Sequence, residues 1–163
     1  MIFITLGTQR FPFNRIIDQV EELKKTYKGD IVIQNGYTKC DLKDVLSQNF
    51  MDSELFINYI KKADIIVTHG GTSSIIKSLE AQKKVIAVPR LQRYKEHVDD
   101  HQLDICSTFE EKGYITVLKE NDHLIEKIES MKNQTFNTYE SNKRDLLNDI
   151  TNYIEIEMVG DPS

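Results

Sequence analysis

The chain has few cysteines and no long apolar run. Cys40 and Cys106 are its only cysteines, and they stand far apart with no metal-binding or redox spacing. We therefore expect free thiols in a reducing compartment rather than a disulfide framework. No apolar run approaches the roughly 18 residues that a membrane-spanning helix requires. The amino terminus, MIFITLGTQR, lacks the basic segment of a signal peptide, so we expect no secretory leader.

Positive charge is also scarce. Lysine and arginine together number 21 against 26 acidic residues, which gives a formal net charge of −5 at pH 7. Proteins that bind nucleic acid through the phosphate backbone usually carry an excess of positive charge. The charge balance therefore argues against nucleic acid as a partner.

Several common catalytic and nucleotide-binding motifs are absent from the sequence. No GxGxxG follows the first apolar run, no Gly-Lys-Ser/Thr of a P-loop follows the later Gly-Gly pair, and no nucleophile elbow occurs. The chain also lacks an Asp-x-Asp pair, a usual holder of a divalent ion on a diphosphate. We therefore predict neither a dinucleotide cofactor nor a bound metal.

What is present is a regular alternation of strand-like and helix-like segments in 163 residues, a length typical of one domain. This alternation predicts an α/β fold with a doubly wound, Rossmann-like parallel sheet. Expected strands cover residues 1–6, 31–33, 45–50 (a short edge strand), 65–67, 84–88 and 114–118. Expected helices cover residues 13–27, 53–62, 72–80, 98–112 and 122–131.

The central stretch of the chain, ADIIVTHGGTSSIIKSLE, spans residues 63–80. It predicts a buried strand, a turn at His69, Gly70 and Gly71, and a helix whose start is capped by the hydroxyls of Thr72, Ser73 and Ser74. A helix start exposes unpaired N–H groups and roughly half a positive charge, and the glycines let a ligand approach the backbone. A phosphate or diphosphate suits such a turn. The alternative is a tight connection in which His69 only packs.

A second glycine loop, Gly7-Thr8, follows the first expected strand. Ligands of open parallel sheets bind at the carboxyl ends of the strands. The two glycine loops can therefore face one crevice, which favours a binding site over two unrelated turns.

The charged segment from Arg90 to Val98 also follows a strand, and two histidines lie at its end. His97 and His101 stand four residues apart, a spacing that can hold zinc on one helix. Position 98 is valine, so the glutamate of a metalloprotease motif is absent. We predict no metal site here.

The carboxyl-terminal part, residues 137–163, predicts a long amphipathic helix followed by a short tail. Its apolar stripe contains Leu146, Leu147, Ile150, Tyr153 and Ile154. This stripe either packs on the chain's own domain, residues 1–136, or forms a contact surface for a partner.

Four ordered segments, MIFITLG, THGGTSSII, VIAVPR and EHVDDHQL, resemble the glycosyltransferase family 28 C-terminal domain over roughly residues 1–118. This domain is the donor-binding half of GT-B enzymes. The chain looks similar to short bacterial capsule and exopolysaccharide transferase subunits, and to the catalytic subunit of the two-part eukaryotic UDP-GlcNAc transferase. The resemblance implies a nucleotide-sugar-binding Rossmann-like domain.

The resemblance also implies roles for individual residues. His69 and Thr8 are the expected catalytic contacts, and the ribose position, a glutamate in many relatives, is Lys77 here with Glu80 one turn later. The expected donor and diphosphate contacts are Gly7, Thr8, His69, Gly70, Gly71, Thr72, Ser73, Ser74 and Arg90. The expected sugar contacts are His97, Asp100, His101 and Gln102.

The activity implied by the resemblance is transfer of a hexose, galactose or glucose in the first place, from a UDP-sugar to a lipid-linked saccharide, with inversion. GT-B enzymes also have an acceptor half, so the chain looks like half an enzyme. Its expected partner is a membrane-anchored subunit, which would hold it at the cytoplasmic face of the membrane. The alternatives are a non-catalytic nucleotide-sugar sensor or scaffold, and a UDP-sugar epimerase, against which the short chain argues.

Overall fold

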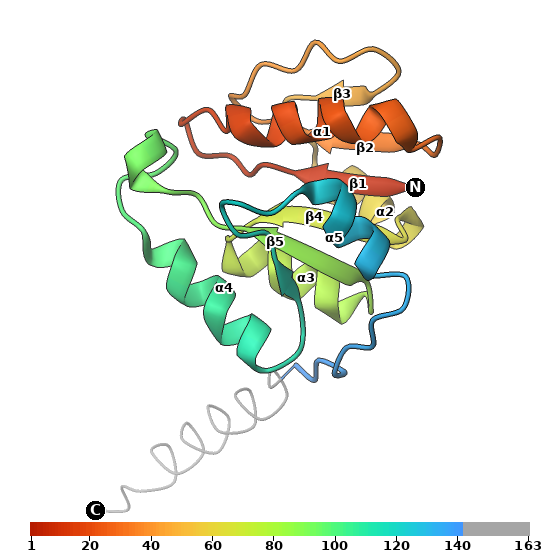
Figure 1. Ribbon diagram of the computed structural model, residues 1–163, viewed down its shortest axis with the longest axis vertical. Helices are drawn as coiled ribbons and strands as arrows, with labels where there is room; N and C mark the ends of the chain where they lie inside the picture. Colours follow the sequence, from red (N-terminus) through yellow and green to blue (C-terminus); the bar gives the residue numbers. More distant parts are fainter. Residues whose placement is uncertain (142–163) are drawn as a thin grey trace, which may run out of the picture.

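The computed structural model describes residues 1–141 and contains, within them, one six-stranded parallel sheet (Figure 1). The strand order is β3-β2-β1-β4-β5-β6, so the chain first builds outward from β1 in one direction and then, from β4, in the other. This order confirms the predicted doubly wound sheet. The strands are β1 Ile2–Thr5, β2 Ile31–Gln34, β3 Leu46–Gln48, β4 Ile65–His69, β5 Lys84–Val88 and β6 Thr116–Val117.

Helices cover both faces of this sheet. Helices α1 and α5 pack on one face, whereas α2, α3 and α4 pack on the other (Figure 1). The helices are α1 Asn14–Thr26, α2 Ser53–Lys62, α3 Thr72–Glu80, α4 His101–Glu111 and α5 Leu124–Ser130, with a 3₁₀ turn at Gln92–Tyr94.

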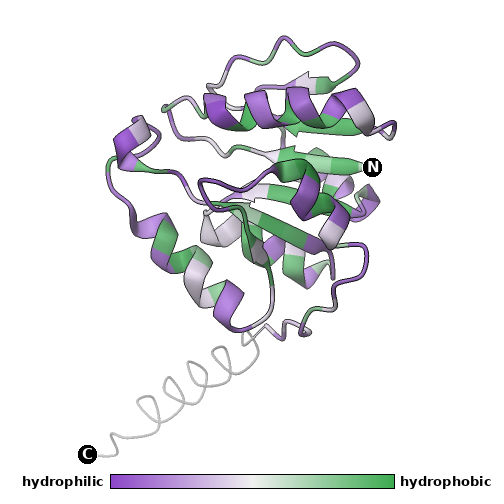
Figure 2. Cartoon of the chain, in the orientation of Figure 1, coloured by the Kyte–Doolittle hydropathy of each residue, from purple (hydrophilic) through white to green (hydrophobic). Residues whose placement is uncertain are grey.

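The alternation of side chains along the strands explains the two layers. In β1, Ile2 and Ile4 pack into the core beneath α1 and α5, while Phe3 packs into the core beneath α2 and α3. A strand that is buried on both faces must be apolar at every position, which is why the predicted strands appear as continuous apolar runs. Figure 2 shows these central strands as hydrophobic, with helices that are polar on their outer sides.

Two helices begin later than the sequence predicts. Helix α4 begins at His101 instead of residue 98 or 99, because the preceding segment folds back after Lys95, which has a left-handed backbone (φ 57°). Helix α5 begins at Leu124, because the carboxylate of Asp122 accepts a hydrogen bond from the backbone N–H of Lys119 instead of capping the helix.

The predicted carboxyl-terminal helix lies mostly outside the described residues. Residues 137–141 are not helical, so the predicted start of this helix at about residue 137 is wrong, and its course from residue 142 onward lies outside the description. None of the described helices is long and apolar enough to span a membrane.

Candidate functional site

A cavity of about 290 Å³ opens at the point where the sheet changes direction. Its wall takes residues from the carboxyl ends of β1, β2 and β4, from α3, from the segment that joins β3 to α2, and from the start of α2. The lining residues are Thr5, Gly7, Thr8, Gln34, Phe50, Met51, Ser53, Phe56, His69, Ser73, Ser74 and Lys77. We call this cavity the switch-point pocket. Both predicted glycine loops contribute to this region of the molecule, as the sequence indicated.

The imidazole of His69 lies between the two glycine loops. A Cβ atom at Gly7 would stand 2.7 Å from its Cε1 atom, and a Cβ at Gly71 would collide with its Nε2 atom. Gly7 also has a left-handed backbone (φ 78°) that a residue with a side chain rarely adopts. These two glycines are therefore required so that the loops can close around the histidine ring.

Gly70 has a different role from its neighbour. It is buried, and a Cβ at this position would lie 2.8 Å from Cβ of Gln102 and 2.9 Å from Sγ of Cys106. Both of these residues belong to α4. Gly70 therefore allows α4 to pack against the turn and does not line the switch-point pocket.

The start of α3 presents backbone donors beside the pocket. Its N-cap is Gly71, and no side chain caps it. The prediction that Thr72, Ser73 and Ser74 cap the helix is therefore wrong; they form its first turn, and the two serines line the pocket. Since the first N–H groups of a helix have no partner within it, they remain available to an anionic ligand.

His69 is neutral under ordinary conditions. Burial, with help from the positive charge of nearby Arg90, lowers the pKa of His69 to about 4. His97 acts in the same direction and so lies near enough to influence the ring. A neutral imidazole offers the pocket a hydrogen-bond donor without a charge.

Because of His69, we expect the free energy of unfolding to decrease as the pH is lowered. Its pKa is about 4 in the folded chain and about 6.5 when unfolded, so the unfolded state binds more protons between these values. The resulting stabilisation is complete above pH 6.5 and is lost as the pH falls towards 4. Urea unfolding at pH 7.5 and 4.5 should show that the wild type loses about 2 to 3 kcal/mol more than His69→Asn does. His123→Asn, at the start of α5, is the control and should behave as the wild type does.

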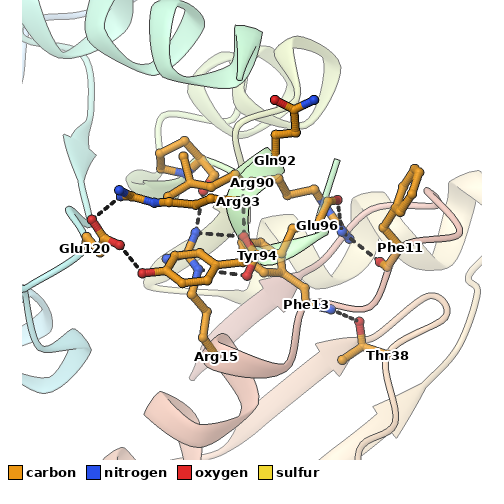
Figure 3. A network of polar contacts seen from close by, with 12 residues as sticks. Phe11, Phe13, Arg15, Thr38, Arg90, Gln92, Arg93, Tyr94, Glu96 and Glu120 are labelled. Atoms are coloured by element: carbon orange, nitrogen blue, oxygen red, sulfur yellow. Dashed lines mark hydrogen bonds and ion pairs between the residues drawn. The ribbon is translucent and has the colours of Figure 1, made fainter. Parts of the chain in front are cut away.

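Arg90 lies outside the pocket and holds two loops together (Figure 3). Its side chain is only 1% exposed, and it donates hydrogen bonds to the carbonyl oxygens of Leu6 (2.6 Å), Phe11 (2.8 Å) and Glu96 (2.9 Å). Its guanidinium also stacks on the ring of Phe13 at 4.6 Å. The Arg90 side chain therefore anchors the loop after β1 to the loop after β5, and a contact of Arg90 with the donor stays a prediction.

The loop after β5 is built around a second buried charge, Glu96. Its carboxylate accepts hydrogen bonds from Arg15 Nε at 2.8 Å and from the backbone N–H of Leu91 at 3.1 Å (Figure 3). Arg93 and Tyr94 of the same loop both bind the carboxylate of Glu120. These contacts explain why a segment predicted as a charged loop has a fixed conformation.

The predicted sugar-binding residues do not converge on the pocket. Asp100 accepts a hydrogen bond from the backbone N–H of Gln92 at 2.7 Å, and the buried Gln102 accepts one from the backbone N–H of Arg90 at 3.0 Å. Only His97 and His101 face each other, with ring centroids 4.7 Å apart. Any contact of this set with a sugar stays a prediction.

The two histidines share one carboxylate. Nδ1 of His97 lies 3.1 Å from Oδ1 of Asp99, and Nδ1 of His101 contacts the same oxygen. The backbone N–H of His101 also donates to this oxygen at 3.2 Å, so Asp99 satisfies the start of α4. His97 precedes the helix, so the two residues do not form the one-helix zinc pair considered from their spacing. Hydrogen bonding within the cluster accounts for its geometry.

Sequence reasoning missed the apolar part of the pocket wall. Phe50 and Met51 line the pocket from the segment between β3 and α2, and Phe56 lines it from α2; Phe50 is 45% exposed. In the sequence Phe50 is the last apolar residue of the expected edge strand, so no signal distinguished it as part of a binding surface. Lys77 also lines the pocket, whereas Glu80, a turn later, does not.

A larger cavity, about 830 Å³, lies elsewhere among the described residues, between α4 and the segment after β6. Its charged groups are largely matched within the chain, since Arg93 pairs with Glu120 and Lys119 lies 3.5 Å from Glu110. The switch-point pocket combines glycine turns with a helix start, and it is therefore the better candidate for binding an anion.

The fold and the pocket define a class of protein: a Rossmann-like domain with an anion-binding turn where its sheet changes direction. Residues 1–155 match the family model of the glycosyltransferase family 28 C-terminal domain. The chain belongs to this family, which confirms the resemblance seen in its sequence.

Sequence relatives include subunits and whole enzymes. The chain is 31% identical over 131 residues to UDP-N-acetylglucosamine transferase subunit ALG13 of Candida glabrata, covering 80% of this chain and 61% of that protein. It is 30% identical over 146 residues to a UDP-N-acetylglucosamine--N-acetylmuramyl-(pentapeptide) pyrophosphoryl-undecaprenol N-acetylglucosamine transferase of Streptococcus agalactiae, covering 90% of this chain and 40% of that protein. The chain thus spans less than two thirds of the length of these relatives.

Solved structures share the fold. The calicheamicin glycosyltransferase CalG4 superposes with a TM-score of 0.65 at 14% identity, over 82% of this chain and 34% of that chain. A solution structure of ALG13 has a TM-score of 0.56 at 18% identity, over 91% of this chain and 93% of that chain. These similarities confirm the predicted relation to GT-B proteins at the level of fold.

Proposed function

We propose that the switch-point pocket binds the diphosphate of a UDP-sugar and that the chain is the donor-binding subunit of a hexosyltransferase. The observation that carries this proposal is the meeting of the Gly7 loop, His69 and the uncapped start of α3 in one pocket. Backbone N–H groups at a helix start, with glycines beside them, suit phosphate oxygens. Thr8, Ser73 and Ser74 add hydroxyl donors in the same wall.

The pocket also has a place for a pyrimidine base. Phe50, Met51 and Phe56 give apolar surface, and Ser53 brings a hydroxyl to the same wall. Planar bases stack on aromatic side chains, and their edges require hydrogen-bonding partners. We therefore propose that the base lies against the apolar side chains of this wall.

The proposed reaction is direct displacement at the anomeric carbon. A hydroxyl oxygen of the acceptor attacks from the face opposite UDP, the bond between that carbon and the β-phosphate oxygen breaks, and UDP leaves with the electron pair. The hydroxyl proton passes to a general base, whose proposed place is beside Gly7 and Thr8. Negative charge grows on the leaving diphosphate, so donors already in position there lower the barrier.

The names of the relatives support our proposals for the acceptor and the partner subunit. A sequence relative is named as a transferase subunit. We propose that a second, membrane-anchored subunit supplies the lipid-linked saccharide and holds the chain at the cytoplasmic face of the membrane. The capsule or exopolysaccharide pathway, and partner contact through residues 137–163, stay predictions.

Calorimetric titration with UDP-galactose, UDP-glucose and UDP-N-acetylglucosamine tests this proposal. The sequence resemblance favours the first two donors, whereas the names of the relatives favour the third. We expect one donor to bind at least about tenfold more tightly than the others, and UDP to compete with it. GDP is the control and should bind weakly. Failure of all three donors and of UDP to bind would overturn the proposal.

Transfer is then measured after co-expression with the partner subunit, as labelled sugar in the lipid fraction. Binding without transfer would support the alternative of a non-catalytic nucleotide-sugar sensor or scaffold. The feature that favours this alternative is Lys77, which stands where many relatives have a glutamate.

A further inference from the structure

The switch-point pocket has one formal charge in its wall. Among the described residues that line it, Lys77 is the only lysine or arginine, and none is an aspartate or glutamate. His69 adds no charge, because its pKa is about 4. The whole chain carries a net charge of −5, so a cationic pocket without carboxylates contrasts with the rest of the molecule. Its electrostatics suit an anionic ligand.

Lys77 is oriented by the helix that carries it. It lies on α3 one turn after Ser73 and Ser74, and residues spaced by three or four positions share a helix face. Side chains on a helix lean towards its amino terminus, so the lysine stem points back to the level of the two serines. Its Nζ atom stands 5.6 Å from the ring centroid of Phe56 on α2. The ammonium group therefore lies at the pocket, beside the first turn of α3.

We infer that Lys77 is the residue by which this pocket selects a nucleoside diphosphate over the nucleoside or monophosphate. The inference rests on the proposed function. The start of α3 and the Gly7 loop provide neutral donors, which bind one phosphate group through hydrogen bonds. A second phosphate adds negative charge, and the ammonium group of Lys77 pairs with this charge. A contact of Lys77 with the ribose is the competing assignment.

Calorimetric titration of UDP, UMP and uridine into the full chain separates the two assignments. Lys77→Met should weaken UDP binding by about 30-fold and uridine binding by less than about twofold, since charge-assisted hydrogen bonds are strong only towards the charged ligand. Lys77→Arg should restore UDP affinity to within about threefold of the wild type, because it keeps the charge. UDP binding by the wild type should weaken as salt rises, and Lys77→Met should remove part of this dependence.

Lys62→Met is the matched control. Lys62 is exposed on α2 and does not line the pocket, so its substitution changes the net charge by the same amount without removing the contact. It should leave UDP binding within about twofold of the wild type. Thermal unfolding of both variants should match the wild type, because Lys77 and Lys62 are exposed.

The outcomes are distinct. Equal loss of UDP and uridine binding in Lys77→Met would assign Lys77 to the ribose and overturn the inference, and so would unchanged UDP binding. In both cases the wild type still binds UDP, and the proposed function stands. A wild-type chain that binds no UDP overturns the proposed function, and the inference with it.

Discussion

His69→Ala should lower sugar transfer about a hundredfold or more while the chain remains folded. The ring is held between the Gly7 and Gly71 loops and is neutral, so under the proposed function it acts as a fixed hydrogen-bond donor to the departing diphosphate. Removal of one such donor typically costs about 3 kcal/mol of transition-state stabilisation. The measurement is the rate at which labelled sugar enters the lipid fraction when the partner subunit is present.

Two comparisons make this result specific. Thermal unfolding should show that His69→Ala is still folded, and His123→Ala, an exposed histidine at the start of α5, should transfer sugar at the wild-type rate. Near-normal transfer by His69→Ala would remove the residue from the mechanism, even if UDP binding were weakened.

Arg90→Met should destabilise the fold by about 3 to 5 kcal/mol, as expected when one member of a buried charged network is removed. The substitution leaves the carbonyl oxygens of Leu6, Phe11 and Glu96 without their donor. Burial lowers the pKa of Arg90, but only to about 10, so the guanidinium is charged at neutral pH and its bonds are charge-assisted. Urea unfolding at pH 7.5 gives the difference in unfolding free energy.

Arg93→Met is the matched control for this change. Arg93 belongs to the same loop, but it is exposed and pairs with Glu120 at the surface. Exposed ion pairs contribute about 0 to 1 kcal/mol, so this variant should unfold close to the wild type. If Arg90→Met were as stable as Arg93→Met, the anchoring role of Arg90 would be wrong.

The sequence predicted the sheet well because its central strands are buried on both sides. Runs such as Ile65 to Val67 must be apolar throughout, and their order along the chain determines the winding of the sheet. The glycine loops were also predictable, because strand ends of a parallel sheet share one edge. The local sequence pattern was enough to place both glycine loops at that edge.

The remaining differences come from contacts between distant segments. The backbone N–H of Arg90 donates to Gln102, and the Arg90 side chain donates to the carbonyl oxygen of Leu6. No local pattern encodes either contact. The later start of α4 is instead a local effect, because Asp99 contacts the rings of His97 and His101, each two residues away, and accepts the backbone N–H of His101. Phe50 was missed because apolar residues that line a ligand pocket look, in sequence, like the end of an edge strand.

The grip of Arg90 on two loops has a consequence for how a donor would be enclosed. Since one guanidinium ties the chain after β1 to the chain after β5, neither segment can swing as an independent flap. On the proposed function, the switch-point pocket has its shape before the donor binds. We therefore expect enclosure of the donor to come from docking of the proposed second subunit and not from movement of these loops.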